Sequence, residues 1–189
     1  DAKVGLQKIS EALGDWKAPD DWYKRAIKEK NEWDAYVEKQ SGPTNQEEPS
    51  YAHAVGAVYR NSDPSDIVVT AAGGLVGEVV QVWKPKQLNT FETEWGFSCM
   101  GYEISGALGI KMAKPDQDVV VFVGDGSYLL NNTDIYSSVI YDQKLIIIVC
   151  DNGGHMVINR LQLAKGGKEY ICNLRAARAT NLKFVDFEN

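Results

Sequence analysis

Two short, continuously apolar segments, each followed at once by a polar glycine-rich turn, constrain this chain more than any other feature. Asp118–Val123 (DVVVFV) leads into Gly-Asp-Gly-Ser, and Leu145–Cys150 (LIIIVC) leads into Asp-Asn-Gly-Gly. Runs of β-branched residues without polar alternation are typical of strands that are buried on both faces. Such strands need helical crossover connections, so the pattern predicts a parallel sheet with helices on both sides.

Helical and strand patterns alternate through the rest of the chain after residue 50. Further strands are expected at Asp66–Ala71 and Leu182–Asp186. Helices are expected at Tyr51–Arg60, from about Val76, at Met100–Ala113 and at about Asn132–Tyr141. The predicted fold class is α/β, with a doubly wound, mainly parallel sheet.

The first fifty residues differ in character from the rest. Asp20–Lys39 carries aromatic and apolar residues at near-helical spacing among charges, and it begins with two acidic residues, as helices often do. The stretch Ser41–Ser50 (SGPTNQEEPS) is rich in turn-forming residues. We expect residues 1–50 to form a helical arm and linker, and residues 51–189 to form the main domain.

Composition and charge exclude several classes of protein. No apolar run among the 189 residues approaches the roughly 20 needed to cross a bilayer, which argues against a membrane protein. The formal net charge is −6 with no basic patch, which argues against a nucleic-acid partner. The three cysteines show no C-x-x-C spacing, so a reducing, cytoplasmic setting is expected.

Polar residues follow the two central strands where ligands usually bind in a doubly wound sheet. Asp125 lies between two glycines after the first strand, and Asn152 follows the second. The 24 residues 127–150 between Gly126 and Asp151 fit one helix and one strand, which brings both strand ends together. Each motif alone is typical of a plain turn. Together they predict an outward-aimed carboxylate and an amide oxygen suited to Mg²⁺, with a helix starting shortly after Ser127 to face phosphate groups.

This pattern, GDG followed after 24 residues by D-N, resembles the signature of thiamine diphosphate-dependent enzymes. The resemblance implies that Asp125 and Asn152, by their side chains, and Gly154, by its backbone carbonyl, hold the Mg²⁺ that anchors the cofactor's diphosphate. The superfamily commonly has Asn-Asn where this chain has Asp151-Asn152. Only the second of these positions is a metal ligand, and it is matched.

The segment Gly96–Ala113 (GFSCMGYEISGALGIKMA) is similar to the G-x-M-G segment that receives the cofactor's two rings. The resemblance implies that Met100 supports the bent cofactor and that the Ser98 carbonyl holds the pyrimidine edge; the alternative is that Met100 is an ordinary core residue. The expected cofactor-binding residues are Gly73, Gly74, Ser98, Met100, Gly124, Asp125, Gly126, Ser127, Asn152, Gly154, His155 and Met156.

Two histidines need separate interpretations. His155 is either a substrate-facing acid or base or, the favoured alternative, a loop residue hydrogen-bonded to backbone. His53 lies on a predicted helix and is expected to be structural. The resemblance implies no other catalytic residue here, because the Glu that activates the cofactor belongs to a separate pyrimidine-binding domain.

A narrower likeness, carried by SCMGYEI and INRLQ, is to the ring-opening hydrolases of inositol catabolism, which act on a trihydroxycyclohexane-1,2-dione. It implies a carbon–carbon bond hydrolase that forms 5-deoxyglucuronate. We expect this chain to be the diphosphate-binding part of a longer polypeptide that works as a homodimer or homotetramer, with an apolar exposed face around Ser98–Tyr102. The alternatives are a subunit of another thiamine diphosphate enzyme, acetolactate synthase-like or a split decarboxylase, and a non-catalytic phosphate-binding module.

Overall fold

The structure is a computed structural model, and it describes residues 1–174 and 187. It divides into two compact units, Asp1–Lys39 and Gln40–Asn189. The strand expected at Leu182–Asp186 lies outside the described residues. Among the described residues, none of the helices combines the length and the apolar character that a bilayer crossing requires.

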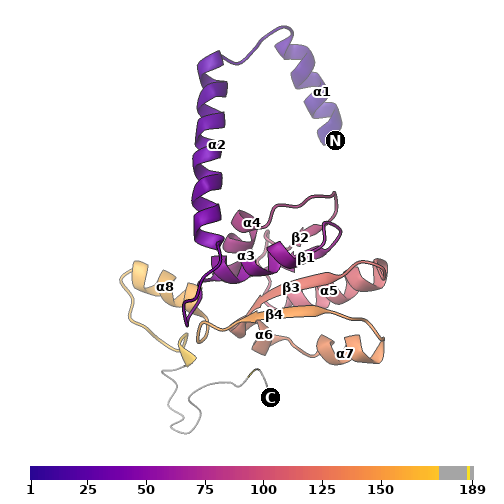
Figure 1. Ribbon diagram of the computed structural model, residues 1–189, viewed down its shortest axis with the longest axis vertical. Coiled ribbons are helices and arrows are strands. Elements are labelled where there is room, and N and C mark those ends of the chain that lie inside the picture. Colours follow the sequence, from indigo (N-terminus) through magenta and orange to yellow (C-terminus); the bar gives the residue numbers. More distant parts are fainter. Residues whose placement is uncertain (175–186, 188–189) are drawn as a thin grey trace. The chain divides into compact units, whose positions relative to one another are not determined.

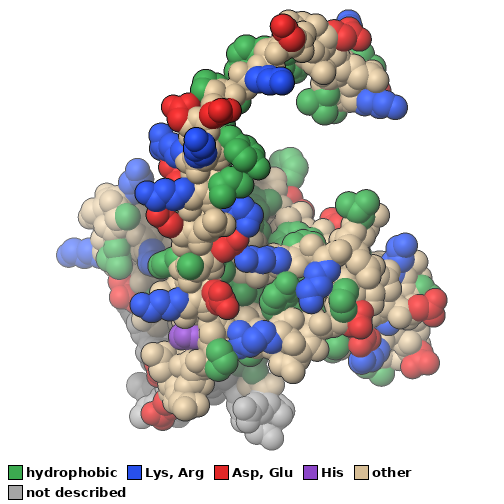
Figure 2. Space-filling view, turned by 45° about the horizontal axis from the view of Figure 1, so that its top comes forward, with side chains coloured by type: hydrophobic (Ala, Val, Ile, Leu, Met, Phe, Trp, Pro, Cys, Tyr) green, Lys and Arg blue, Asp and Glu red, His purple; other side chains and the backbone are tan. Residues whose placement is uncertain are grey.

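The first unit consists of two helices, α1 (Ala2–Leu13) and most of α2 (Asp20–Ser41). The predicted helix at Asp20–Lys39 is therefore confirmed, and α1 is an addition to the prediction. Acidic and basic side chains cover much of α2 (Figure 2). Three pairs of them are spaced i,i+4, Arg25–Glu29, Lys28–Glu32 and Lys30–Asp34. Exposed pairs of this kind are screened by solvent and contribute little to helix stability.

The second unit is built on a four-stranded parallel sheet in the order β2-β1-β3-β4 (Figure 1). The strands are β1 (Ile67–Thr70), β2 (Phe91–Thr93), β3 (Val119–Gly124) and β4 (Ile146–Cys150). Three of the predicted strands and the parallel arrangement are confirmed. The edge strand β2 is absent from the prediction, since its three residues, one of them exposed, carry no apolar run.

In the described part of this unit, six helices accompany the sheet: α3 (Tyr51–Asn61), α4 (Gly73–Val82), α5 (Tyr102–Ala113), α6 (Asp125–Leu130), α7 (Asp134–Ile140) and α8 (Met156–Ala164). The expectation that a helix starts shortly after Ser127 is wrong. Gly124 has extended backbone angles, φ −75° and ψ 152°, so the turn is complete there and helical geometry begins at Asp125. Helix α4 likewise begins at Gly73 instead of Val76, and α8 was not expected.

Successive residues of the central strands pack on opposite faces of the sheet. One face joins Val69, Val121 and Val123 to Ile104 and Ala107 of α5 in a single buried cluster. On strand β3 the alternate residue Phe122 meets Trp83, which follows α4, edge to face at 6.1 Å between ring centroids. Both faces of the sheet are therefore covered by helices, as the continuous apolar runs predict.

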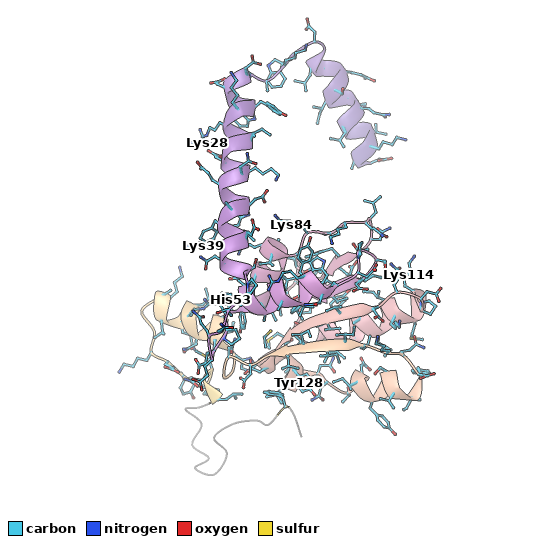
Figure 3. The ribbon with its side chains drawn as sticks, viewed as in Figure 1. Lys28, Lys39, His53, Lys84, Lys114 and Tyr128 are labelled. Carbon is cyan, nitrogen blue, oxygen red and sulfur yellow. The ribbon has the colours of Figure 1, made fainter. Side chains whose placement is uncertain are left out.

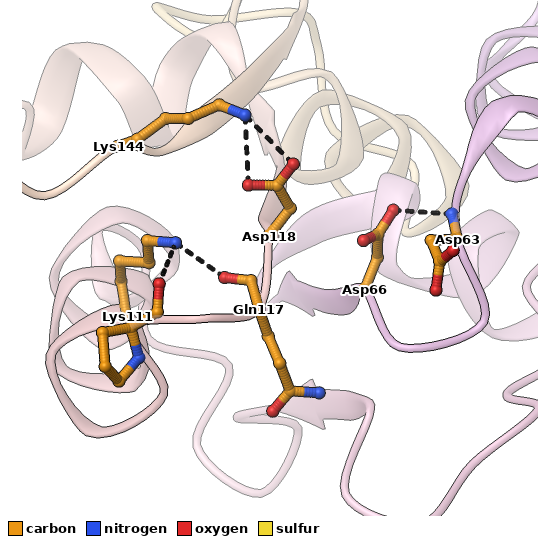
Figure 4. Close-up of polar contacts among 7 residues, drawn as sticks. Asp63, Asp66, Lys111, Gln117, Asp118 and Lys144 are labelled. Carbon is orange, nitrogen blue, oxygen red and sulfur yellow. Dashed lines mark hydrogen bonds and ion pairs between the residues drawn. The ribbon is translucent and has the colours of Figure 1, made fainter.

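The direction in which the chain adds strands to the sheet reverses at the centre of the sheet, between β1 and β3. From β1 the chain continues to the neighbouring edge strand β2, whereas β3 and β4 extend on the opposite side of β1. The loops that leave β1 and β3 therefore diverge to opposite sides, and this leaves a crevice beyond the carboxyl ends of these strands. At the other end of the sheet, Lys144 pairs with Asp118 at 3.0 Å (Figure 4).

Candidate functional site

A cleft lies at the carboxyl ends of β1, β3 and β4, and all twelve residues expected to bind the cofactor line it. They come from the start of α4, the loop before α5, the start of α6 and the loop after β4. The lining also contains six residues that were not expected to bind the cofactor: Tyr51, Ala72, Leu75, Val157, Ile158 and Leu161. Three of these belong to helix α8, which was not predicted.

Asp125 is the most unusual group in the cleft. Only 1% of the residue is exposed, so it is buried at the base of the cleft. The sequence pattern instead predicts a carboxylate aimed outward at the rim. Among the described residues, neither carboxylate oxygen has a hydrogen-bond partner. Burial raises the pKa of Asp125, and the charge of Asp151 raises it further. The backbone N–H groups of Gly126, Asn152 and Gly154 lie near enough to lower it in part, but none of them meets the geometry of a hydrogen bond to the carboxylate. A buried, unpartnered carboxylate is unfavourable unless a ligand compensates it.

The loop after β4 supplies two further oxygen atoms to the cleft, from Asn152 and Gly154. The Asn152 amide nitrogen donates to the Tyr51 hydroxyl, and its Oδ1 accepts from Gly154 N at 3.2 Å. The Gly154 carbonyl accepts from Met156 N at 3.0 Å. Each of these two oxygens has a second lone pair, so each retains the capacity to act as a ligand.

The donor set of the cleft fits a hard divalent cation that is completed by phosphate oxygens and water. No group of three or more His, Cys, Asp or Glu that could hold a metal ion is found in the part of the chain that the structure describes. One orphaned carboxylate, one amide oxygen and one backbone carbonyl match the oxygen ligands that Mg²⁺ takes, and Mg²⁺ usually keeps waters and binds substrate phosphates. The residues therefore fit the ion that the sequence pattern implies.

The loop that carries Ser98 and Met100 is held from within by Glu94. The Glu94 carboxylate accepts from Phe97 N at 2.9 Å and from Cys99 N at 2.7 Å, and these bonds lower its pKa. Ser98 has φ +52°, in the left-handed region. The apolar surface expected at Ser98–Tyr102 is displaced slightly toward the N-terminus: Phe97 is 90% exposed, while Gly101 at the other end is buried.

His155 lies against the glycine that follows Asp125. A Cβ added at Gly126 would be 2.6 Å from His155 Nδ1, so only glycine leaves room for this ring. The backbone of His155 donates to Cys172 O at 2.8 Å and accepts from Asn159 N at 3.1 Å. His53, which is labelled in Figure 3, is structural, as expected. With Ser50 it forms the capping box of α3, in which Ser50 Oγ and His53 Nδ1 are 3.0 Å apart.

Glu103 is the functional candidate that the sequence analysis missed. It is 1% exposed, and its carboxylate accepts hydrogen bonds from three segments that border the cleft. A signal exists in the sequence, since Glu103 is the only acidic residue in the mainly apolar α5 segment YEISGALGIKMA. Neither periodicity nor spacing indicates which groups such a residue meets.

The sheet order, the position of the cleft and its oxygen-rich base define a cofactor-binding domain of the diphosphate-binding class. Residues 71–188, more than half of the chain, match the family described as "Thiamine pyrophosphate enzyme, C-terminal TPP binding domain". The chain belongs to this family, which confirms the resemblance seen in the GDG and M-G motifs.

Several curated relatives carry one name, 3D-(3,5/4)-trihydroxycyclohexane-1,2-dione hydrolase. The protein of Lacticaseibacillus casei is 40% identical over 148 residues, which cover 78% of this chain and 23% of the relative. That of Geobacillus thermodenitrificans is 35% identical over 199 aligned residues, which cover 93% and 31%, respectively. That of Halalkalibacterium halodurans is 41% identical over 115 residues, which cover 61% and 18%. The chain thus spans less than a third of the length of these relatives.

Proposed function

We propose that this chain is the part of a thiamine diphosphate- and Mg²⁺-dependent hydrolase that binds the diphosphate of the cofactor. The proposed reaction of the whole protein is the hydrolytic ring opening of trihydroxycyclohexane-1,2-dione to 5-deoxyglucuronate in inositol catabolism. The single observation that supports the binding role most strongly is the buried, unpartnered carboxylate of Asp125 at the base of a cleft lined by the motif residues. The substrate rests on the names of the relatives.

The residues of the cleft would divide the work of holding the cofactor. Asp125, Asn152 and the Gly154 carbonyl would bind the Mg²⁺, whose remaining ligands are diphosphate oxygens and water. Gly73 and Gly74 open helix α4 at the cleft, where free backbone N–H groups face anions. Met100 would support the rings. The bound cofactor supplies the carbon nucleophile and electron sink, while the protein contributes position and electrostatics.

The proposal also includes a second domain and a partner subunit. The activating Glu would come from a pyrimidine-binding domain of the same or a partner subunit, in a homodimer or homotetramer. Exposed apolar side chains at Trp95 and Phe97, beside the cofactor-binding loop, support an interface there.

His155 is the candidate acid or base in this chain, since its ring lines the cleft next to Gly126. The three free cysteines support a cytoplasmic location.

The test is a calorimetric titration of this chain with thiamine diphosphate, with and without Mg²⁺. We expect binding that requires the metal and that Asp125→Ala abolishes. The matched control is Asp151→Asn, which removes the neighbouring exposed charge and retains an oxygen that accepts from Gly153 N. Absence of binding up to millimolar cofactor, or binding that survives Asp125→Ala, contradicts the proposed site.

The proposed substrate needs a separate assay on the whole protein. We expect the dione to be consumed with release of acid, and pyruvate, the usual substrate of acetolactate-forming relatives of the superfamily, to be left unchanged. Turnover of pyruvate in place of the dione would contradict the hydrolase and leave the cofactor site intact.

A further inference from the structure

The carboxylate of Glu103 joins three segments of the chain that are distant in sequence. Its Oε1 accepts from Ala72 N at 3.1 Å, and its Oε2 accepts from Gly101 N at 2.9 Å and from Ser127 Oγ at 2.9 Å. The fourth bond of the cluster runs from Gly101 N to Ser127 Oγ at 2.8 Å. All of these bonds are buried, and Glu103 itself does not line the cleft.

Each partner of Glu103 is adjacent to a different wall of the cleft. Ala72 is the N-cap of α4 and precedes Gly73 and Gly74. Gly101 is the N-cap of α5, in the left-handed region at φ +94°, and directly follows Met100. Ser127 lies two residues after Asp125 in α6. One buried group therefore meets the segments expected to contact the diphosphate, the rings and the metal.

We propose that Glu103 is a positioning residue that fixes these three walls relative to one another and thereby sets the affinity of the cleft for its metal–diphosphate ligand. This inference rests on the proposed function. The role requires a carboxylate, because all three partners donate and both oxygens must accept. In Glu103→Gln the side-chain NH₂ group faces either Ala72 N–H or Gly101 N–H, and neither backbone donor can become an acceptor.

The same helix offers a matched control at its opposite end. Lys111 of α5 is also buried and charged, and its Nζ donates to Pro115 O at 2.9 Å and to Gln117 O at 2.7 Å (Figure 4). None of these residues lines the cleft. Lys111→Met therefore removes a buried hydrogen-bonded charge from α5 without altering a wall of the cleft, and separates positioning from general loss of stability.

The experiment measures two properties in the native chain, Glu103→Gln and Lys111→Met. The first is the affinity for thiamine diphosphate at saturating Mg²⁺; we expect a decrease of about 10- to 100-fold in Glu103→Gln, the range for groups that orient metal ligands, and no change in Lys111→Met. The second is amide hydrogen exchange without cofactor; we expect faster exchange at Ala72 and Gly101 in Glu103→Gln alone.

The outcomes separate this inference from the proposed function. If the native chain does not bind the cofactor, the proposed function fails, and the exchange data by themselves decide whether Glu103 holds the walls. Unchanged exchange at Ala72 and Gly101 in Glu103→Gln overturns the inference, as does equal loss of affinity in both variants. If Glu103→Gln does not fold, Ser127→Ala replaces it and is read by hydrogen exchange alone, because Ser127 itself lines the cleft. Loss of one of the three donors to Glu103 is expected to speed exchange at Gly101, and native exchange there would overturn the inference.

Discussion

Asp125 shows how a single residue can serve binding at the expense of stability. Its side chain is buried, and burial raises its pKa, so the fold without a ligand is less stable with this carboxyl group ionised than with it protonated. Natural proteins retain such groups where a ligand compensates them. The same property that makes Asp125 a good metal ligand therefore makes it an unfavourable core residue.

We therefore predict that Asp125→Ala increases the stability of the chain in the absence of metal. Removing an unsatisfied buried carboxylate should raise the free energy of unfolding by about 1 kcal/mol, while Mg²⁺-dependent binding is lost. Urea denaturation in the presence of a chelator measures the change, with Asp151→Asn as the control that should leave stability within about 0.5 kcal/mol. A clear decrease in the stability of Asp125→Ala would show that the carboxylate supports the fold.

The pH dependence of Glu94 is opposite to that of Asp125, because its pKa is lowered in the folded chain. Hydrogen bonds from Cys99 N and Phe97 N favour the ionised carboxylate. At pH values above the ordinary pKa of 4.5 these bonds hold the Ser98–Met100 loop, and they are lost as the pH falls through the lower pKa of the folded chain. Amide chemical shifts of Phe97 and Cys99 should therefore titrate together with a midpoint below 4.5. In Glu94→Gln this transition should be absent. Midpoints at or above 4.5 would mean that the bonds do not form in solution.

At the scale of elements, the packing of helix α3 depends on the absence of a side chain at Gly56. A Cβ at this position would be 2.1 Å from Ser41 O, the backbone carbonyl at the end of α2. Arg60 of α3 donates to the same carbonyl. Ser41, which belongs to the second unit, and helix α3 therefore approach so closely here that even a methyl group does not fit.

We predict that Gly56→Ala lowers the free energy of unfolding by about 1 to 3 kcal/mol through overpacking. Gly109 of α5 is the matched position, since a Cβ there meets no atom within 4 Å. Gly109→Ala should raise stability by roughly 0.5 to 1 kcal/mol, because alanine reduces the entropy of the unfolded chain. Thermal and urea unfolding of both variants decide the point, and equal effects of the two substitutions would refute the close packing.

At the scale of the whole molecule, the second unit exposes an apolar face on helix α7. Tyr136, Val139 and Ile140 are 72%, 71% and 62% exposed, respectively, and their i, i+3 and i+4 spacing places them on one side of the helix. Leu129 and Leu130 at the end of α6 are also exposed. Contiguous exposed apolar side chains of this kind mark interaction surfaces.

We predict that this face mediates self-association of the chain, as a second interface besides the one proposed at Trp95 and Phe97. Sedimentation velocity at increasing concentration should show species larger than a monomer, and Val139→Glu should shift the population toward monomer. Met112→Glu, at an exposed apolar position of α5, is the control and should leave the distribution unchanged. A native chain that stays monomeric at high concentration, or equal behaviour of the two variants, would exclude α7 as the interface.

The sequence by itself determined the parallel sheet and the location of the cleft. The apolar runs before Gly124 and Asp151 encode buried strands locally, and the geometry of parallel strands then places the turns after both strands at one edge of the sheet. For this reason the twelve expected residues lie together in the structure. Their individual roles stay predictions until the titrations are made.

Tertiary structure alone decided which distant groups meet in the cleft. The Tyr51 hydroxyl contacts Asn152 across 101 positions of the chain, Glu103 joins the walls from Ala72 to Ser127, and Asp125 is buried instead of exposed. Periodicity records which face of a helix or strand is apolar, and it carries no information about the partner that the face or a lone polar residue finds. Those pairings depend on how the crossover helices pack on the sheet, which is a property of the folded chain as a whole.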